Sequence, residues 1–168
     1  MPYLPDETLF SAISCFTYSE LCLQQFLSRL IWLGNQLGLN FKGIKQATWF
    51  SLVKANKLSS LVDWLDWQLD DLSNVPNIGK KQSEMIIRQF QLAKKASFSQ
   101  WLNALGMTGL PESIKSYCWQ ELMRWDIKDW QNKLSLSTKR ATLYYQLAHE
   151  IMRTGIANTL IKIKIDGF

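Results

Sequence analysis

Apolar residues recur at helical intervals along most of the chain. From Glu20 onward they lie three and four residues apart, which predicts an amphipathic helix that ends near Gly38. The same spacing predicts further helices at residues 46–56, 60–73, 80–96, 98–105, 112–125 and 138–153. Short connections between short helices are typical of a compact all-α bundle, which is the fold class we expect.

The two ends of the chain depart from this pattern. Residues 1–19 contain Pro2 and Pro5 and no helical period, so we expect an irregular segment there. Residues 160–165 alternate between apolar and charged with the period of two that is typical of a strand, although an extended tail docked on the fold fits equally well. We therefore expect a helical domain at residues 20–155, followed by an extended C-terminal tail at 156–168.

The connection before residue 80 has the composition of a specialised turn. Ile78 lies between Asn77 and Gly79, two residues that tolerate unusual backbone angles, and a helix begins at once with Lys80 and Lys81. This pattern predicts a hairpin in which Ile78 fills the gap between two helices. The free amides of the new helix and the lysines could then bind a phosphate without reading a base. The alternative is an ordinary turn with a solvated lysine pair.

Weaker copies of this turn occur elsewhere in the chain. Gly43, Ile44 and Lys45 precede another predicted helix, with Lys45 at the place of the second glycine. A third candidate begins at Gly109 and has a proline at its helix start, where a missing amide is tolerated. The fourth, at residues 134–140, lacks glycine, but Ser137 could cap the helix and Lys139 and Arg140 could meet phosphate. Together the four form a degenerate internal repeat.

Net charge indicates the kind of partner, and cysteine content indicates the compartment. The net charge is +5, divided into −2 over residues 1–71 and +7 over residues 72–168, and the isoelectric point is about 9.1. This balance weakly favours a polyanionic partner that binds the second part of the chain. Cys15, Cys22 and Cys118 are an odd number in irregular positions, which predicts reduced thiols in a cytoplasm. Charged residues interrupt every apolar run, so we expect no membrane span.

Residues 74–110 read NVPNIGKKQSEMIIRQFQLAKKASFSQWLNALGMTGL. This run resembles the second hairpin, the following helix and the entry to the third hairpin in the helix-hairpin-helix domain of bacterial NAD-dependent DNA ligases. Residues 22–30 and 38–43 resemble the exit from that family's zinc module and its first hairpin. The resemblance covers about residues 12–155 and is closest to the shorter second ligase type, which lacks the terminal BRCT domain.

The resemblance implies a module that binds double-stranded DNA without sequence specificity, around a nick and mainly from the minor-groove side. The residues that we expect to contact DNA are Gly43, Ile44, Lys45, Ile78, Gly79, Lys80, Lys81, Gly109, Lys139 and Arg140. Neutralising six phosphates would give a slope of about −5 for log K against log salt. A ligase catalytic core is a further expected partner, and the bacterial cytoplasm, with its nucleoid, is the expected location.

The resemblance does not extend to the catalytic machinery, so we expect no enzymatic activity from this chain on its own. NAD and Mg²⁺ would belong to a missing adenylation domain. Residues 164–167 match the family's Lys-x-Asp-Gly motif, but we interpret the match as tail packing, because a nucleotide pocket needs many more residues. Residues 1–19 would be a remnant of a linker or of the zinc module. Only Cys15 and Cys22 fall in the matching region, and because a structural zinc site needs four ligands, we expect no zinc.

Other chemistry is weakly supported. A single His149 does not indicate a catalytic triad, and the acidic residues at 63–71 fit a solvated helix face better than a metal site. The eight tryptophans lie at helical spacing beside aliphatic residues, which favours core packing over base stacking. Two alternatives to DNA binding remain: a helical domain that docks on a protein, and a non-functional fragment of a ligase gene.

Overall fold

The computed structural model describes residues 16–55 and 57–168, and within these ranges the protein is helical without strands. The predicted all-α class is therefore confirmed. The α-helices are α2 (Leu23–Leu33), α3 (Gln46–Lys54), α4 (Lys80–Ala93), α5 (Phe98–Ala104), α6 (Trp119–Leu122), α7 (Ile127–Leu134), α8 (Thr138–Arg153) and α9 (Ile156–Lys162). Short 3-10 helices are η2 (Glu20–Cys22), η3 (Asp63–Asp66), η4 (Leu69–Leu72) and η5 (Glu112–Ser116).

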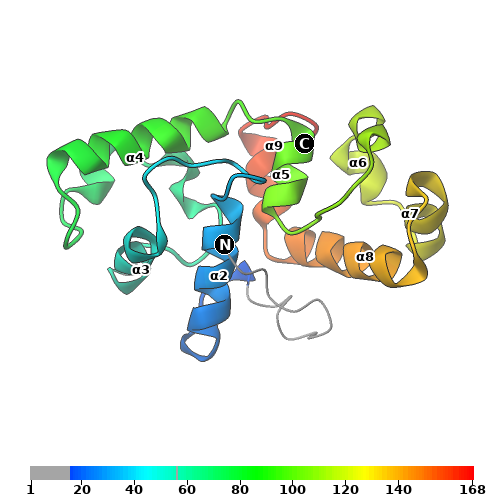
Figure 1. Ribbon diagram of the computed structural model, residues 1–168, viewed down its shortest axis with the longest axis horizontal. Helices are drawn as coiled ribbons and strands as arrows, with labels where there is room; N and C mark the ends of the chain where they lie inside the picture. Colours follow the sequence, from blue (N-terminus) through cyan, green and yellow to red (C-terminus); the bar gives the residue numbers. More distant parts are fainter. Residues whose placement is uncertain (1–15, 56) are drawn as a thin grey trace.

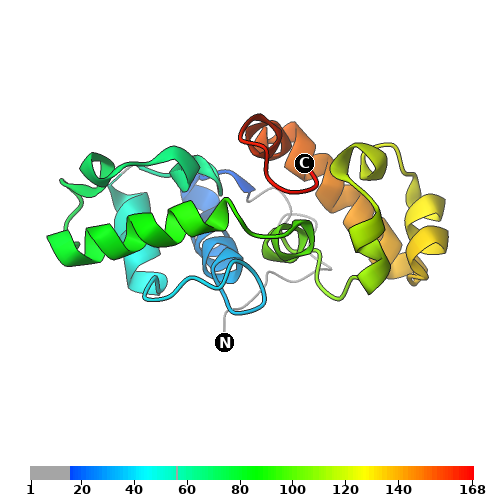
Figure 2. The same cartoon turned by 90° about the horizontal axis from the view of Figure 1, so that it is seen from above.

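The helices form an elongated molecule with two ends joined by a central group (Figures 1 and 2). Helices α3 and α4 and the 3-10 helices η3 and η4 make one end, and α6, α7 and α8 make the other. Helices α2, α5 and α9 lie between them, with α2 packed on both α3 and α5, and α9 packed on α8. The chain therefore runs through one end, crosses the centre at α5, and returns to the centre at α9.

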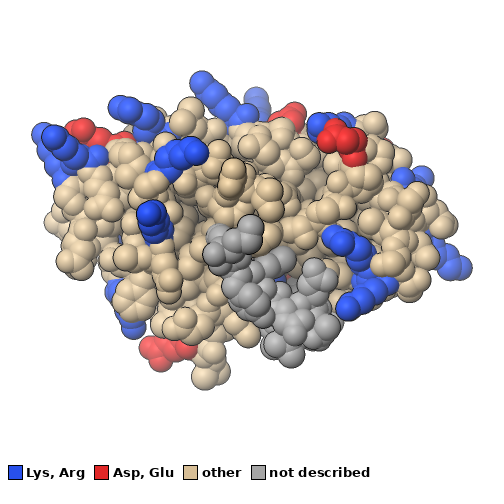
Figure 3. Space-filling view, viewed as in Figure 1, with Lys and Arg blue, Asp and Glu red and all other residues tan. Residues whose placement is uncertain are grey.

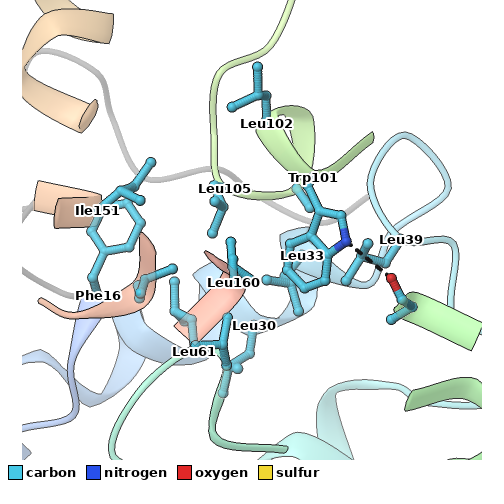
Figure 4. Packing of buried hydrophobic residues seen from close by; sticks show 14 of the residues in the cluster. Phe16, Leu30, Leu33, Leu39, Leu61, Trp101, Leu102, Leu105, Ile151 and Leu160 are labelled. Atoms are coloured by element: carbon cyan, nitrogen blue, oxygen red, sulfur yellow. Dashed lines mark hydrogen bonds between the residues drawn. The ribbon is translucent and has the colours of Figure 1, made fainter. Parts of the chain in front are cut away.

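A single apolar core runs through the molecule, and aromatic rings fill much of it. Six of the eight tryptophans are buried: Trp49, Trp64, Trp101, Trp119, Trp125 and Trp130. In the centre, the rings of Trp64 and Trp101 stack with centroids 6.1 Å apart. The indole nitrogen of Trp101 donates a hydrogen bond of 3.1 Å to the carbonyl of Ala93 (Figure 4). The predicted use of tryptophan for core packing is confirmed for these six residues.

Two of the predicted helices were wrong in type, because residues within them adopt extended backbone. The segment 60–73 forms η3 and η4, which are separated by Trp67 with ψ of 146°. The carboxylate of Asp63 accepts bonds from the amides of Ser59 and Ser60 and so caps a turn instead of continuing a helix. In the segment 112–125, extended backbone at Tyr117 and Cys118 separates η5 from α6.

Two helices were missed by the sequence pattern. Helix α7 begins at Asp126, whose carboxylate accepts a bond of 2.8 Å from the amide of Asp129. Helix α9 replaces the expected strand or extended tail over residues 156–162, so that expectation was wrong. Its buried residues Ile156, Ala157 and Leu160 have helical spacing, whereas Ile161 in the alternating run is exposed. The helical spacing of the buried residues, and not the alternation that begins at Leu160, therefore decides the structure of this segment.

The expectation of an irregular segment at residues 1–19 can be followed only from residue 16, because residues 1–15 lie outside the described residues. Phe16 is buried in the core, with the guanidinium of Arg29 4.3 Å from its ring centroid. The amide of Tyr18 donates to the carbonyl of Ser59 at 2.8 Å, beside a single antiparallel bridge from Thr17 to Ser60. Residues 17–19 form no helix or strand beyond this bridge, and these contacts hold them to the fold.

The last residues form a docked segment after α9. A carboxylate oxygen of Asp166 accepts a bond of 3.0 Å from the amide of Phe98, at the start of α5. The carbonyl of Gly167 accepts a bond of 2.7 Å from the amide of Trp119, at the start of α6. The ring of Phe168 lies between those of Phe98 and Trp119, at centroid distances of 5.3 and 5.2 Å. The tail packing inferred for the Lys-x-Asp-Gly match is therefore confirmed.

Substituting Asp166→Ala should destabilise the fold modestly. Because the carboxylate satisfies an amide at the start of α5, its loss should lower the free energy of unfolding by about 1 kcal/mol. Urea denaturation followed by circular dichroism measures this change. Asp166→Asn, which keeps an acceptor oxygen, should lose less, and equal losses in the two variants would contradict the capping role.

Candidate functional site

Four short turns in the fold share one backbone conformation. The first residue of each has a positive φ: 77° at Gly43, 67° at Asn77, 73° at Gly109 and 54° at Ser135. An apolar residue follows in each turn, and then a residue with extended backbone that caps the next helix. We name these units turn 1 (residues 43–45), turn 2 (77–79), turn 3 (109–111) and turn 4 (135–137). The predicted repeat is therefore a repeat of backbone geometry.

The middle residue of each turn attaches it to the core. Ile44 is buried, and its counterparts Ile78, Leu110 and Leu136 are half-buried against the core. The predicted role of Ile78, to fill the gap between two helices, agrees with this placement. Because the apolar side chain points inward, the flanking positions of each turn face outward. The turns therefore present backbone and polar groups to solvent.

The positive φ falls on the first residue of each turn and not on the last. Asn77 adopts it in turn 2, because asparagine tolerates the left-handed region better than most residues do. Gly79 has φ of −83° and ψ of 175°, a conformation open to any residue, and a Cβ atom there would meet nothing within 4 Å. The fold itself therefore does not require glycine at position 79.

Turn 1 has its glycine at the first position and not at the last, the reverse of turn 2. Gly43 needs its positive φ, and a Cβ atom at this position would lie 2.6 Å from the terminal methyl of Met85 on α4. Lys45, where the sequence departs from the expected glycine, has extended backbone with φ of −120°. Lysine fits that conformation without strain, so the departure does not alter the shape of the turn.

Turns 1 and 2 are held side by side by contacts to α4. The amide of Lys42 donates a bond of 3.0 Å to the side-chain oxygen of Gln89. The side chains of Gln82 on α4 and Thr48 on α3 lie 3.5 Å apart and form a second bond. The starts of α3 and α4 are therefore fixed relative to each other.

Turns 3 and 4 form a second pair, joined by side chains of α8. The Arg140 guanidinium donates to the carbonyl of Thr108 and to the hydroxyl of Tyr144, which itself donates to the same carbonyl. Ser137 accepts a bond of 3.2 Å from the amide of Arg140, which confirms the cap predicted for α8. Arg140 is half-buried, whereas its neighbour Lys139 is exposed.

Helix α2 and the loop after it are bonded to α5, which precedes turn 3. The indole nitrogen of Trp32 on α2 donates a bond of 2.9 Å to the carbonyl of Asn103 on α5, and the Asn103 side chain donates to the carbonyl of Leu37 in the loop. These bonds hold the loop before turn 1 against the helix before turn 3. In Figure 2 the loop before α3, the loop after α5 and the connection from α7 to α8 lie along the same edge of the molecule.

The starts of the helices that follow three of the turns carry basic residues and no acidic ones. Helices α3, α4 and α8 have no acidic residue in the first turn, and Lys45, Lys80, Lys81 and Lys139 lie at their starts with exposed side chains. Among the described residues, no side chain caps α3 or α4, so their first amides remain available. Figure 3 shows lysine and arginine side chains spread over one face, with acidic ones near its upper and lower edges. Such helix starts can bind an anion.

Comparison with known proteins finds a similar segment in a DNA ligase. Over 166 residues, the chain is 33% identical to a protein named DNA ligase B from Pseudomonas putida (strain W619). The chain is homologous to a segment of DNA ligase B. The match covers 98% of this chain and 29% of that protein, so the chain spans less than a third of the length of the relative. No protein-family model matches the chain.

The remaining candidate groups of the chain have structural or surface positions. Asp71 accepts a bond of 2.7 Å from the amide of Gln68, and His149 is exposed with its ring beside Tyr145. Within residues 16–55 and 57–168, no three histidine, cysteine or acidic residues are grouped to hold a metal ion, and Cys15 falls outside these ranges. In the same part of the chain, no helix is both long and apolar enough to span a membrane.

Sequence reasoning missed some features of the turns. It did not identify the left-handed conformation of Ser135, which no glycine marks, and it gave no role to Lys42, whose amide ties turn 1 to α4. A usable signal existed in the shared order of residues, because an apolar residue follows each positive-φ position and a helix starts two residues later. These contacts left no local signal in the sequence, since they join residues that are 32 to 71 positions apart.

Proposed function

We propose that this chain binds double-stranded DNA through its sugar-phosphate backbone, as the helix-hairpin-helix module of an NAD-dependent DNA ligase. The observation that carries the proposal is the repeated turn geometry, in which an exposed helix start with lysines follows a left-handed residue. The homology to DNA ligase B supports DNA as the polyanion. The expected substrate is duplex with a nick, gripped from the minor-groove side.

The binding mechanism uses two kinds of group at each turn. Backbone amides at the start of α3 and α4 donate hydrogen bonds to phosphate oxygens, and the neighbouring lysines neutralise the phosphate charge. Neither group reaches a base edge, so binding is independent of sequence. The apolar residue of each turn contacts the core and fixes the position of the amides.

Ligation chemistry belongs, in this proposal, to parts of the ligase relative that the chain does not match. NAD and Mg²⁺ would be bound there, and the chain would act in the bacterial cytoplasm beside such a catalytic core. The Lys-x-Asp-Gly match at residues 164–167 supplies no nucleophile in this account, because Asp166 and Gly167 are hydrogen-bonded to the starts of α5 and α6.

Glycine-to-alanine variants of turns 1 and 2 should separate folding from binding. Gly79→Ala should fold normally, because the position has ordinary backbone angles and open space, yet it should weaken DNA binding about tenfold by placing a methyl group where phosphate approaches. Gly43→Ala should instead destabilise the fold by about 1–2 kcal/mol, since its φ of 77° lies in the left-handed region that alanine disfavours. Thermal unfolding and fluorescence anisotropy measure the two effects. Unchanged binding by the position 79 variant would contradict phosphate contact at turn 2.

The proposal is tested by fluorescence anisotropy with the purified chain and labelled DNA. We expect binding to two duplexes of unrelated sequence with equal affinity, and tighter binding when each carries a central nick. A strong preference for one sequence would contradict recognition through the backbone. Absence of binding to every duplex at low salt would favour a domain that docks on a protein, such as a ligase catalytic core, or a non-functional fragment.

A further inference from the structure

Turn 3 shares the backbone of the other turns but differs from them in chemistry. It ends in Pro111, which has no amide hydrogen, and leads into the five-residue 3-10 helix η5 instead of an α-helix. Glu112 places a negative charge in the first turn of η5, where its carboxylate pairs with Lys115 at 2.6 Å. A missing donor and an acidic group both disfavour a phosphate at this position.

The space beside Gly109 in turn 3, where a side chain would begin, is already occupied by the protein itself. A Cβ atom at Gly109 would lie 2.7 Å from a guanidinium nitrogen of Arg140. The same guanidinium donates to the carbonyl of Thr108 and to the hydroxyl of Tyr144, and its carbon lies 5.4 Å from the Tyr144 ring centroid. The space that glycine leaves at position 109 is therefore filled by an arginine from α8.

We infer that turn 3 is a positioning element that binds no phosphate, and that Arg140 is the positioning residue that fixes turn 4 against it. This inference rests on the proposed DNA-binding function. Turns 1, 2 and 4 then contact DNA, and the Arg140 guanidinium, with its donors directed at turn 3, sets the position of the α8 start. Lys139, exposed beside it, makes the phosphate contact at turn 4.

The salt dependence of binding distinguishes a phosphate contact from a positioning role. Losing one phosphate contact lowers the magnitude of the slope of log K against log salt by about 0.9. We expect Lys139→Gln to show this change. We expect Arg140→Gln to weaken binding about fivefold at every salt concentration while the slope stays unchanged, because the α8 start is held less firmly but Lys139 still reaches its phosphate.

Two further variants keep the test decisive if Arg140→Gln folds poorly. Tyr144→Phe removes only the hydroxyl of the same cluster, and should also weaken binding in parallel at all salt concentrations. The double substitution Glu112→Gln with Lys115→Gln leaves the net charge unchanged, and should alter neither affinity nor slope. Circular dichroism spectra and melting curves confirm that each variant is folded.

The outcomes distinguish failure of the inference about turn 3 and Arg140 from failure of the proposed DNA binding. A slope reduced by about 0.9 in Arg140→Gln, or any loss of slope in the Glu112/Lys115 double variant, would overturn the positioning role while leaving DNA binding intact. Unchanged affinity in both Arg140→Gln and Tyr144→Phe would also overturn it. If the wild-type chain binds no duplex at low salt, the proposed function fails, and this inference fails with it.

Discussion

The double substitution Lys80→Glu with Lys81→Glu should weaken duplex binding about 100-fold at low salt, which corresponds to about 2.7 kcal/mol. Both side chains are exposed in the first turn of α4, next to amides that no side chain caps; that turn has no acidic residue, and Glu84 follows it. Reversing their charge removes two phosphate contacts and opposes the helix dipole's attraction for an anion. Fluorescence anisotropy of a nicked duplex measures the loss.

The same helix offers a control of equal charge. Lys94 and Lys95 are exposed just beyond the other end of α4, about 20 Å from its start at 1.5 Å per residue. Lys94→Glu with Lys95→Glu changes the net charge identically, so it should weaken binding far less if contact at turn 2 is local. Equal losses in the two double variants would show that overall charge, and not the turn, governs binding.

Replacing Trp64 with alanine should lower the free energy of unfolding by about 3–5 kcal/mol, a large part of the stability of a typical domain. The indole is fully buried, its centroid lies 4.6 Å from that of Phe90 and 5.3 Å from that of Phe41, and its nitrogen donates a bond of 2.6 Å to the carbonyl of Leu61. It joins η3 to α4 and to the loop before turn 1. Urea denaturation with a fluorescence readout measures the loss.

Trp67 supplies the comparison for this prediction. It follows η3 directly and also contacts Phe90, at 6.1 Å between centroids, but it is only half-buried. Because less of its surface leaves water on folding, Trp67→Ala should cost less than half as much as Trp64→Ala. A cost at Trp67 that matches the cost at Trp64 would contradict the assignment of Trp64 to the centre of the core.

Most of the α-helices were predictable from their apolar faces, and the failures have separate causes. The period of three and four residues located α2, α3, α4, α5 and α8, because each buries one apolar face. It failed over residues 60–73, where Asp63 caps a turn, and at α9, where the alternating run misled it. Helix α7 was missed although Ile127, Trp130 and Leu134 have helical spacing, so a local signal for this helix was present in the sequence.

The candidate site was predictable in its parts but not in its assembly. The order of residues identified the turns, because the pattern of an apolar residue just before a helix start is contained in a few consecutive residues. The structure changed the interpretation of single residues within them: Asn77 carries the left-handed conformation, and Arg140 contacts turn 3 instead of solvent. These differences arise from contacts between distant segments, on which a single sequence gives no information.

The salt dependence of wild-type binding tests the central claim most directly. Five exposed lysines, at positions 42, 45, 80, 81 and 139, lie beside the turns that we assign to DNA. If each neutralises one phosphate, a plot of log K against log salt for a nicked duplex should have a slope of about −4.5. A slope near zero, or no binding at low salt, would contradict the account.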